Sequence, residues 1–174
     1  MLSQPNVFLI GPMGSGKSAV GRHLARLLRC SFHDSDADIE ARTGVDIAFI
    51  FEKEGEAGFR LRERESIERL TRLTGVVIAT GGGALLNATN RENLARNGVL
   101  VCLNARTGTL LERLKDDLTR PLLEGENLEQ KLERLMKDRQ AVYALCSVQV
   151  DTDGKTIAQV AEEIVQKVSP KWQA

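Results

Sequence analysis

One stretch of the chain, Gly11 to Ser18, constrains what the rest can fold into. It reads GPMGSGKS, a glycine, four residues and then Gly-Lys-Ser, which is the pattern of a loop that holds phosphate groups. A short apolar run at 6–10 precedes the loop, and apolar residues at helical spacing follow it over 18–28. The glycines allow successive backbone N–H groups to converge on phosphate oxygens at a helix N-terminus. The sequence therefore predicts a strand, a phosphate-binding loop and a helix, in that order.

The charged and hydroxyl side chains of this loop indicate a nucleoside triphosphate with Mg²⁺. Lys17 would bring a positive charge to the β and γ phosphates. Ser18 would offer its hydroxyl group to Mg²⁺, which prefers oxygen ligands and bridges the same phosphates. We therefore expect the nucleotide to contact Gly14, Ser15, Gly16, Lys17, Ser18 and Ala19.

The composition and the charge balance favour a small-molecule partner. The 174 residues are 42% apolar and 28% charged, which is ordinary for a globular protein and predicts one domain over residues 1–174. Basic and acidic residues number 24 each, so no overall charge draws the chain to nucleic acid or to an anionic membrane. The N-terminus lacks a basic region and no apolar run reaches 18 residues, so we expect a cytoplasmic protein with reduced cysteines.

Apolar runs and helical patterns alternate along the rest of the chain. Beyond residues 6–10, strands are expected at 32–33, 76–79, 99–103 and 147–151. Helices are expected at 18–28, 37–43, 46–54, 56–73, 90–97, 107–115, 127–145 and 156–168. Strands separated by helices predict an α/β fold, a three-layer sandwich in which a five-stranded parallel sheet has helices on both faces.

Two helices are expected between the second and third strands. Asp46 is a good N-cap for the short first helix, and Gly55 ends it. The longer second helix should carry most of its charged side chains in solvent. Its inward residues are expected to be Phe59, Ile67, Leu70 and Leu73.

Three features lie on the same rim of the predicted sheet as the phosphate-binding loop. Asp34 and Asp36 follow the second strand, Gly81–Gly83 follow the third, and Arg60 lies near the start of the longer helix between them. Asp36 would orient a hydroxyl group, or take its proton, in line with a γ-phosphate. Arg60 would hold an anionic group, and the three glycines would bring backbone N–H groups to a ligand. Together these features predict a pocket for a phosphate acceptor.

Residues 116–127 interrupt the helical pattern. The segment contains an Arg-Pro pair, Arg120-Pro121, and a glycine, and it has no clear apolar period. A long aperiodic connection between two well-formed helices is usually functional or disordered. We therefore expect a mobile lid over residues 116–127.

The chain resembles the shikimate kinase family over essentially its whole length. The motifs that carry the resemblance are GPMGSGKS at 11–18, FHDSD at 32–36, GEAGFR at 55–60, ATGGG at 79–83, RPLL at 120–123 and the pair Asp138-Arg139 followed by Tyr143. The resemblance implies a P-loop fold like that of nucleoside monophosphate kinases, with a lid at 116–127 and a substrate-binding region at 34–62. It also implies transfer of the γ-phosphate of ATP to the 3-hydroxyl of shikimate, in the route to aromatic amino acids, by a monomer.

The resemblance gives the acceptor-side residues individual roles. Asp36 would bind and activate the acceptor hydroxyl, and Arg60 and Arg139 would clamp the substrate carboxylate. Backbone groups of Gly81, Gly82 and Gly83 would contact the ring hydroxyls, while the ring itself would lie between Phe51 and Phe59.

On the nucleotide side, the resemblance places two residues at the metal and three near ATP. Ser18 would bind Mg²⁺ directly, and Asp34 would act at the ion through water. Arg120 would reach the phosphates from the lid. Arg113 and Lys155, which match by spacing and not by motif, would border the adenine.

The sequence departs from the family pattern at one place, and three other functions are alternatives to that of the family. The family commonly reads R-x-P-L-Y where this chain reads Arg139-Gln140-Ala141-Val142-Tyr143, so the local helix is expected to continue further.

A related small-molecule kinase, such as a gluconate kinase, would share the loop and the lid without needing two arginines for a carboxylate. A non-catalytic nucleotide-binding relative would have no reason to keep Lys17, Asp36 and Arg139 together. A GTPase would need an Asn-Lys-x-Asp guanine motif, which is missing from the sequence.

Overall fold

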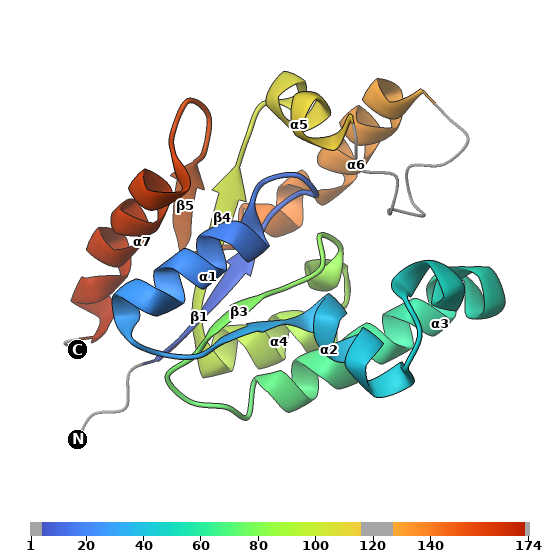
Figure 1. The fold of residues 1–174 in the computed structure, drawn as a ribbon, viewed down its shortest axis with the longest axis horizontal. Helices are drawn as coiled ribbons and strands as arrows, with labels where there is room; N and C mark the ends of the chain where they lie inside the picture. The colour runs from blue at the N-terminus through green and yellow to red at the C-terminus, as the bar shows by residue number, and fades with distance from the viewer. Residues whose placement is uncertain (1–4, 116–126, 173–174) are drawn as a thin grey trace.

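The computed structural model describes residues 5–115 and 127–172, which form a parallel sheet between two layers of helices (Figure 1). The strands are β1 (Asn6–Ile10), β2 (Phe32–Asp34), β3 (Val77–Ala79), β4 (Gly98–Asn104) and β5 (Val148–Asp151). The helices are α1 (Lys17–Leu28), α2 (Ser35–Thr43), α3 (Ile47–Leu70), α4 (Ala88–Asn97), α5 (Thr107–Leu114), α6 (Leu128–Tyr143), α7 (Ile157–Trp172) and the short 3₁₀ helix η1 (Ala84–Leu86). The predicted α/β sandwich is confirmed.

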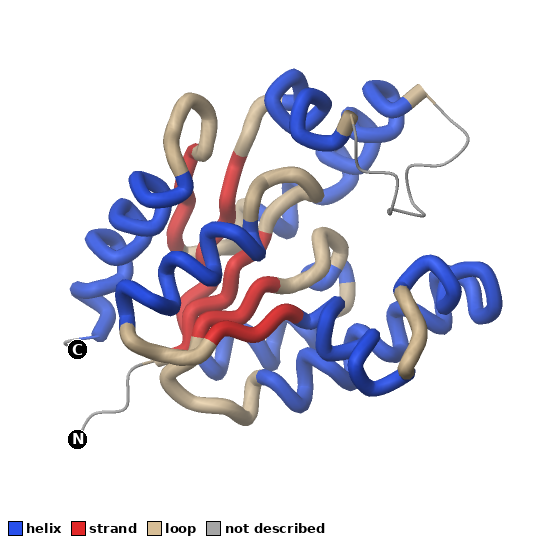
Figure 2. Tube along the Cα trace, in the orientation of Figure 1, coloured by secondary structure: helices blue, strands red, loops and turns tan. Residues whose placement is uncertain are grey.

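The five strands are ordered β2-β3-β1-β4-β5, and every pairing between neighbours is parallel (Figure 2). Leu9, Ala79 and Asp34 lie side by side across β1, β3 and β2, close to the carboxyl end of each strand. Because parallel strands end at the same edge, the loops that follow β1, β2 and β3 leave the sheet together. Ligands of open α/β sheets bind at this edge.

Strand β1 is buried on both faces, which explains its unbroken apolar sequence. Val7 and Leu9 face α1 and α7, whereas Phe8 and Ile10 face the layer that contains α3, α4 and α6. Side chains alternate between the faces of a strand, so β1 contributes to both halves of the core. Figure 1 shows α1 and α7 side by side on one face of the sheet.

Helix α3 contains the break that the sequence predicts. Asp46 caps its start by accepting a hydrogen bond from the backbone N–H of Phe49 over 2.7 Å. Gly55 has φ 68° and ψ −174°, a conformation outside the helical region that glycine adopts readily. The helix ends at Leu70, three residues earlier than expected, and the chain then turns toward β3. Leu73 lies in this turn and is 36% exposed, so the prediction that it faces inward is wrong.

Several other boundaries differ from the expected ones because side chains cap the helices early. Asp34 caps α2, which places Asp36 inside the helix and not in the connection before it. Asn87 caps α4, which begins at Ala88, two residues before the predicted start. Helix α6 extends through Tyr143, as expected from the missing proline, but Leu145 lies beyond it and is exposed.

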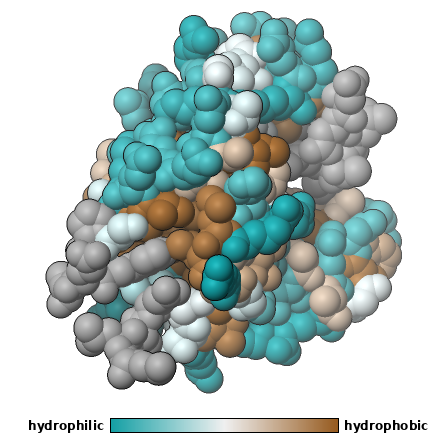
Figure 3. All heavy atoms as spheres, turned by 60° about the vertical axis from the view of Figure 1, so that its left-hand side comes forward, coloured by the Kyte–Doolittle hydropathy of each residue, from teal (hydrophilic) through white to brown (hydrophobic). Residues whose placement is uncertain are grey.

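The surface is that of an ordinary globular protein. Figure 3 shows one face on which largely hydrophilic surface surrounds a smaller apolar area. Among the described residues, the exposed large apolar side chains are spread over several elements, and they are Leu27, Phe49, Leu61, Leu73, Leu86, Leu145 and Ile157. Within residues 5–115 and 127–172, no helix has the length and apolar character needed to cross a membrane. Cys30, Cys102 and Cys146 are free thiols, the last two buried.

Candidate active site

Three adjoining cavities lie beyond the carboxyl ends of the strands. Two lie where the segments after β1, β2 and β3 meet, and the third lies between the phosphate-binding loop and the residues after β5. The Arg60 cavity, of about 470 Å³, is lined by the glycine loop (Gly81–Gly83) and by Asp36, Phe51, Phe59, Arg60, Glu63 and Arg139. The Lys17 cavity, of about 380 Å³, contains Lys17, Ser18, Asp34, Asp36, Gly81 and Gly82. The Lys155 cavity, also about 380 Å³, contains Ser15, Ala19, Arg113, Lys155 and Ile157.

The phosphate-binding loop has the backbone that its glycines predict. Gly16 has φ 92° and caps α1, so the helix begins at Lys17 with its N-terminus beside the Lys17 cavity. A side chain at Gly11 is excluded, because its Cβ would lie 2.5 Å from the carbonyl oxygen of Leu103. Lys17 Nζ donates to the carbonyl oxygens of Gly11 and Pro12 over 2.9 and 2.8 Å. The loop thus combines a helix N-terminus with an ammonium group, two features that favour an anion.

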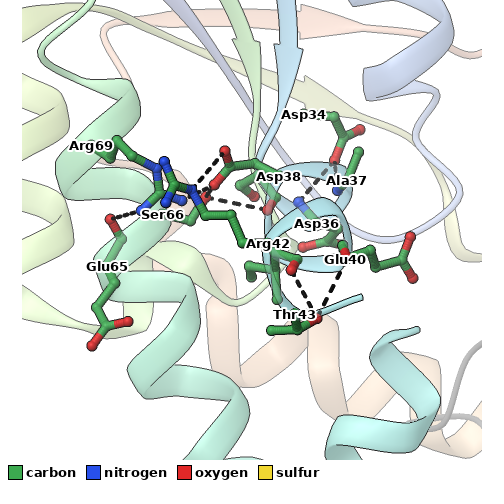
Figure 4. Close-up of polar contacts among 12 residues, drawn as sticks. Asp34, Asp36, Ala37, Asp38, Glu40, Arg42, Thr43, Glu65, Ser66 and Arg69 are labelled. Atoms are coloured by element: carbon green, nitrogen blue, oxygen red, sulfur yellow. Dashed lines mark hydrogen bonds and ion pairs between the residues drawn. The ribbon is translucent and has the colours of Figure 1, made fainter. Parts of the chain in front are cut away.

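Ser18 and Asp34 face each other across the Lys17 cavity. Ser18 Oγ donates a hydrogen bond to Asp34 Oδ2 over 2.6 Å. The other carboxylate oxygen of Asp34 accepts the backbone N–H of Asp36 over 3.0 Å, as part of the α2 cap (Figure 4). The capping bond therefore fixes the carboxylate while leaving Oδ2 turned toward Ser18. A hydroxyl and a carboxylate oxygen at this separation are the oxygen donors that Mg²⁺ prefers.

Asp36 lines both the Arg60 cavity and the Lys17 cavity, together with Gly81 and Gly82. It lies in the first turn of α2, two residues after the strand-end acid Asp34. A group bound in either cavity would therefore contact this wall. The arrangement places one carboxylate at the junction between a potential phosphate site and a second ligand site.

Arg60 is held by two acidic side chains of its own helix. Its Nη1 donates to Glu63 Oε2 over 2.8 Å, and its Nη2 donates to Glu56 Oε1 over 3.0 Å. Burial works against the charged guanidinium, but Glu63 and Glu56 outweigh it and raise the pKa of Arg60. Arg60 is therefore a fixed positive charge in the wall of the cavity.

Glu63 is the most deeply buried charged group of the site, with its side chain 1% exposed. Burial raises the pKa of its carboxyl group, and the positive charges of Arg60 and Arg139 oppose that effect only in part. Oε1 accepts no hydrogen bond from the part of the chain that the structure describes. It faces Gly81, where any Cβ would collide with it.

Arg139 approaches the glycine loop from α6 and is 4% exposed. A Cβ at Gly82 would lie 3.1 Å from Arg139 Nη1, and one at Gly83 would lie 2.5 Å from Arg60 Nη2. The absence of side chains at these two glycines therefore lets both guanidinium groups come close to the loop. Arg139 Nε is buried and has no hydrogen-bond partner in the described residues.

Phe51 and Phe59 lie on opposite sides of the break at Gly55, and their rings stack at the Arg60 cavity. The ring centroids are 4.8 Å apart with an interplanar angle of 33°. The turn at Gly55 brings the first part of α3 back toward the second, which makes this contact possible. The pair forms an apolar part of the cavity wall, and Arg60 Cζ lies over the Phe59 ring, 5.3 Å from its centroid.

Arg113 and Lys155 meet at the Lys155 cavity from different elements. Arg113 Nη1 donates to the carbonyl oxygen of Gly14 over 3.1 Å and to Thr152 Oγ1 over 3.2 Å. Lys155 Nζ pairs with Glu163 over 2.7 Å. The guanidinium of Arg113 thus connects the phosphate-binding loop to the residues after β5.

Every predicted site residue in the described part of the chain lines at least one of the three cavities. Arg120 and residues 116–126 of the expected lid lie outside the described residues. Glu63 is a site residue that the sequence does not predict, because most charged side chains of this helix are expected in solvent. The available signal was spacing, since Glu63 follows Arg60 by three residues and shares its helix face.

The sequence profile of the family Shikimate kinase matches residues 13–169. A shikimate kinase from Shewanella woodyi is 43% identical over 97% of this chain and 99% of its own length, and one from Thiobacillus denitrificans is 47% identical over 97% and 92%. The solved structure of shikimate kinase from Acinetobacter baumannii in complex with shikimate has a TM-score of 0.94 at 44% identity, covering 98% of this chain and 96% of that one. A gluconokinase from Sinorhizobium meliloti, at 19% identity and a TM-score of 0.66, is similar in fold.

Proposed function

The chain belongs to the shikimate kinase family, and we propose that it transfers the γ-phosphate of ATP to the 3-hydroxyl of shikimate, giving shikimate 3-phosphate. The observation that carries this function is the shared wall of two cavities. Asp36, Gly81 and Gly82 border both the Lys17 cavity, which suits phosphates, and the Arg60 cavity, which suits a small anion with a ring. Phosphoryl transfer depends mainly on positioning and charge stabilisation, so two sites that meet at one carboxylate are the required arrangement.

Arg60 and Arg139 are proposed to hold the shikimate carboxylate. Guanidinium groups match carboxylates in geometry and form bonds stronger than those between neutral groups. Arg139 lines the same cavity as Arg60, and its buried Nε has no hydrogen-bond partner among the described residues. The oxygens of a substrate carboxylate would give Arg139 Nε a partner.

Phe51 and Phe59 are proposed to cover the apolar part of the ring, while the glycine loop contacts its hydroxyl groups. Stacked phenyl rings supply apolar contact area without competing for hydrogen bonds. The backbone of Gly81–Gly83 can approach closely because it carries no side chains. This division of apolar and polar contacts would orient the ring within the cavity.

Asp36 is proposed to act on the 3-hydroxyl. Its carboxylate would accept a hydrogen bond from that hydroxyl and take its proton. The hydroxyl oxygen forms a bond to the γ-phosphorus while the bond to the β–γ bridging oxygen breaks, and ADP leaves. Asp36 suits this role because it lies where the two cavities meet.

The phosphates are proposed to bind the N–H groups of the loop at the start of α1, with Lys17 beside them. Lys17 Nζ would exchange the carbonyl oxygens of Gly11 and Pro12 for oxygens of the β and γ phosphates. An ammonium placed there stabilises the charge that develops as the phosphoryl group moves. Arg113 and Lys155 are proposed to border the adenine, which would occupy the Lys155 cavity next to Ile157.

Mg²⁺ is proposed to bind at Ser18 directly and at Asp34 through water. The fit rests on the two oxygens that already face each other over 2.6 Å in the Lys17 cavity. When bound, Mg²⁺ would neutralise charge on the β and γ phosphates. Asp34 is held for this task by its capping bonds to α2.

We also propose that the enzyme acts as a monomer in the cytoplasm. The three cavities are lined by described residues of a single chain, which supports an active monomer. Sedimentation of the active enzyme at assay concentration tests the oligomeric state.

The test of the function is an assay of ADP release with three acceptor conditions. Shikimate should support turnover with ATP, whereas gluconate and buffer alone should not. Turnover with gluconate in place of shikimate would favour the related small-molecule kinase, and nucleotide binding without turnover on either acceptor would favour a non-catalytic protein.

A further inference from the structure

Ser35 lies between the acids proposed for the metal and for the acceptor, and none of the roles above uses it. Its side chain is fully buried, and its Oγ accepts the backbone N–H of Gly81 over 3.1 Å. We infer that Ser35 is a positioning residue, whose hydroxyl group fixes the backbone of Gly81 against Asp36 and so aligns the acceptor hydroxyl with the γ-phosphate. This inference rests on the proposed function.

Ser35 extends the connection between β2 and β3 by one step beyond the strands. The last register pair between these strands is Asp34 with Ala79. The backbone N–H of Thr80 then turns to β1, where it donates to the carbonyl oxygen of Leu9 over 3.1 Å. The next donor along the chain is the N–H of Gly81, which Ser35 Oγ receives. A side chain thus takes over where backbone pairing between β2 and β3 stops.

Helix α3 holds the same segment from the other side (Figure 4). Ser66 is fully buried, and its hydroxyl lies 2.7 Å from Asp38 Oδ2 and 3.3 Å from the carbonyl oxygen of Ser35. Arg69 pairs with the same carboxylate oxygen of Asp38. The first turns of α2, which carry Ser35 and Asp36, are therefore fixed to α3 as well as to the glycine loop.

The face of α3 that holds α2 also carries the charged wall of the Arg60 cavity. Ser66 follows Glu63 by three residues and Arg60 by six, a spacing that places all three along one face of a helix. Ser35 thus lies between this face and the glycine loop, and it determines where its neighbour Asp36 lies. Through Ser35, the first turn of α2 is connected to α3 and to the glycine loop, the three parts of the chain that would surround the acceptor hydroxyl.

Gly81 depends on this bond because it has no side chain with which to anchor itself. A Cβ at this position would collide with Glu63 Oε1, so the backbone is the means of holding it. Loss of the Ser35 hydroxyl group would leave the buried N–H group of Gly81 without a hydrogen-bond acceptor, which favours a shift of the backbone. Because Gly81 and Asp36 form the wall shared by both cavities, a small shift would misalign the reacting atoms more than it would weaken either substrate.

Steady-state kinetics of Ser35→Ala with ATP and shikimate test the inference. We expect kcat to fall by about tenfold to a hundredfold, with KM for ATP within about twofold of wild type. Ser35→Thr keeps the hydroxyl group and should restore most of the lost kcat. The matched control is Thr71→Val, which removes a buried hydroxyl that bonds to Glu68 at the end of α3, away from the cavities. This control should turn over like wild type.

Hydrogen exchange of the Gly81 amide gives a readout that does not depend on turnover. The amide should be protected in the wild type without ligands and in Ser35→Thr, and it should exchange faster in Ser35→Ala. Exchange of the wild-type amide at the rate of an exposed loop would overturn the inference, whether or not the protein phosphorylates shikimate. An active wild type with an equally active Ser35→Ala variant would also overturn it. The same holds if the Gly81 amide is protected in Ser35→Thr but the kcat of that variant stays as low as that of Ser35→Ala.

Discussion

Tyr143 donates its phenolic hydrogen to the carbonyl oxygen of Gly82 over 2.6 Å, and this bond joins the end of α6 to the glycine loop. Arg139 precedes Tyr143 by one helical turn and lies against the same glycine. The two side chains therefore hold the loop from one helix, one through a neutral bond and the other through close approach of a charge. Tyr143 is in this way linked to the placement of the proposed carboxylate clamp.

The first prediction concerns Tyr143→Phe. The substitution keeps the ring but leaves the carbonyl oxygen of Gly82 without its donor, which should cost about 1 to 3 kcal/mol of unfolding free energy. KM for shikimate should rise by about fivefold or more, because the loop is proposed to contact the ring hydroxyls. KM for ATP should change little. Urea unfolding and steady-state kinetics measure both effects, and an unchanged KM for shikimate would separate Tyr143 from substrate binding.

Absorbance titration of the phenol provides an independent check, because Tyr143 is the only tyrosine of the chain. Burial raises its pKa to about 12, with Arg139 opposing the shift in part. Because the pKa is raised in the folded protein, the neutral phenol makes its full contribution to the unfolding free energy below the ordinary pKa near 10. This contribution is lost as the pH rises toward about 12. Ionisation of the folded protein near pH 10 would show that the hydroxyl is not buried as described.

The second prediction is a pH-dependent difference between the wild type and Glu63→Gln. Burial raises the pKa of Glu63, so its contribution to stability is greatest below the ordinary pKa of about 4.3 and declines as the pH rises through its raised value. Glutamine has no such titration. The unfolding free energy of the wild type should therefore fall relative to Glu63→Gln across this window.

Urea unfolding of both proteins from pH 4 to 8 measures this difference. The ion pair with Arg60 requires a charged Glu63, so its effect is already included in the net upward shift of the Glu63 pKa. Any cost of the substitution that does not depend on protonation offsets the two curves without altering their relative slope. Glu56→Gln removes the exposed partner of Arg60 and serves as the matched control for the loss of a carboxylate beside this guanidinium. Parallel curves for the wild type and Glu63→Gln would contradict the raised pKa of the carboxyl group.

The general form of this site follows from the sequence because strand ends meet at one edge of a parallel sheet. The apolar runs fix which segments become strands, and the polar residues directly after them must then lie together. Asp34, Gly81 and the phosphate-binding loop are brought together in this way. Gly55 was likewise predictable, since glycine ends a helix through a local backbone preference.

The features that were missed depend on how helices pack after they form. Helical spacing puts Glu63 on the face of Arg60, but only the packing of α3 against the glycine loop decides that this face is buried. Leu73 is the opposite case, a residue predicted to be buried that is exposed. Its apolar side chain continues the helical pattern of the sequence, but the helix has already ended at Leu70. The bond between Ser35 and Gly81 joins residues 46 apart in the chain and has no local signal.

The third prediction separates the roles of the two acids near β2. Asp36→Asn keeps the shape of the side chain but removes the charge, so kcat should fall by about 10² to 10⁴ while KM for ATP hardly changes. Asp34→Asn should instead raise the Mg²⁺ concentration needed for half-maximal rate. Kinetics at several Mg²⁺ concentrations distinguish the two variants. If Asp36→Asn shows the stronger Mg²⁺ dependence, Asp36 belongs to the metal site and Asp34 becomes the candidate for the acceptor.

The fourth prediction tests the carboxylate clamp through Arg139→Lys. Lysine keeps the positive charge but cannot form the paired bonds of a planar guanidinium, so KM for shikimate should rise by about tenfold or more. KM for ATP should stay near that of the wild type, because Arg139 lines the Arg60 cavity and not the Lys17 cavity.

The decisive substrate is a shikimate analogue in which a neutral primary amide replaces the carboxylate. The wild type should bind this analogue weakly, and Arg139→Lys should lose little further with it, since the interaction has already been removed. Equal losses with shikimate and with the amide would mean that Arg139 maintains the glycine loop or α6 and does not bind the carboxylate.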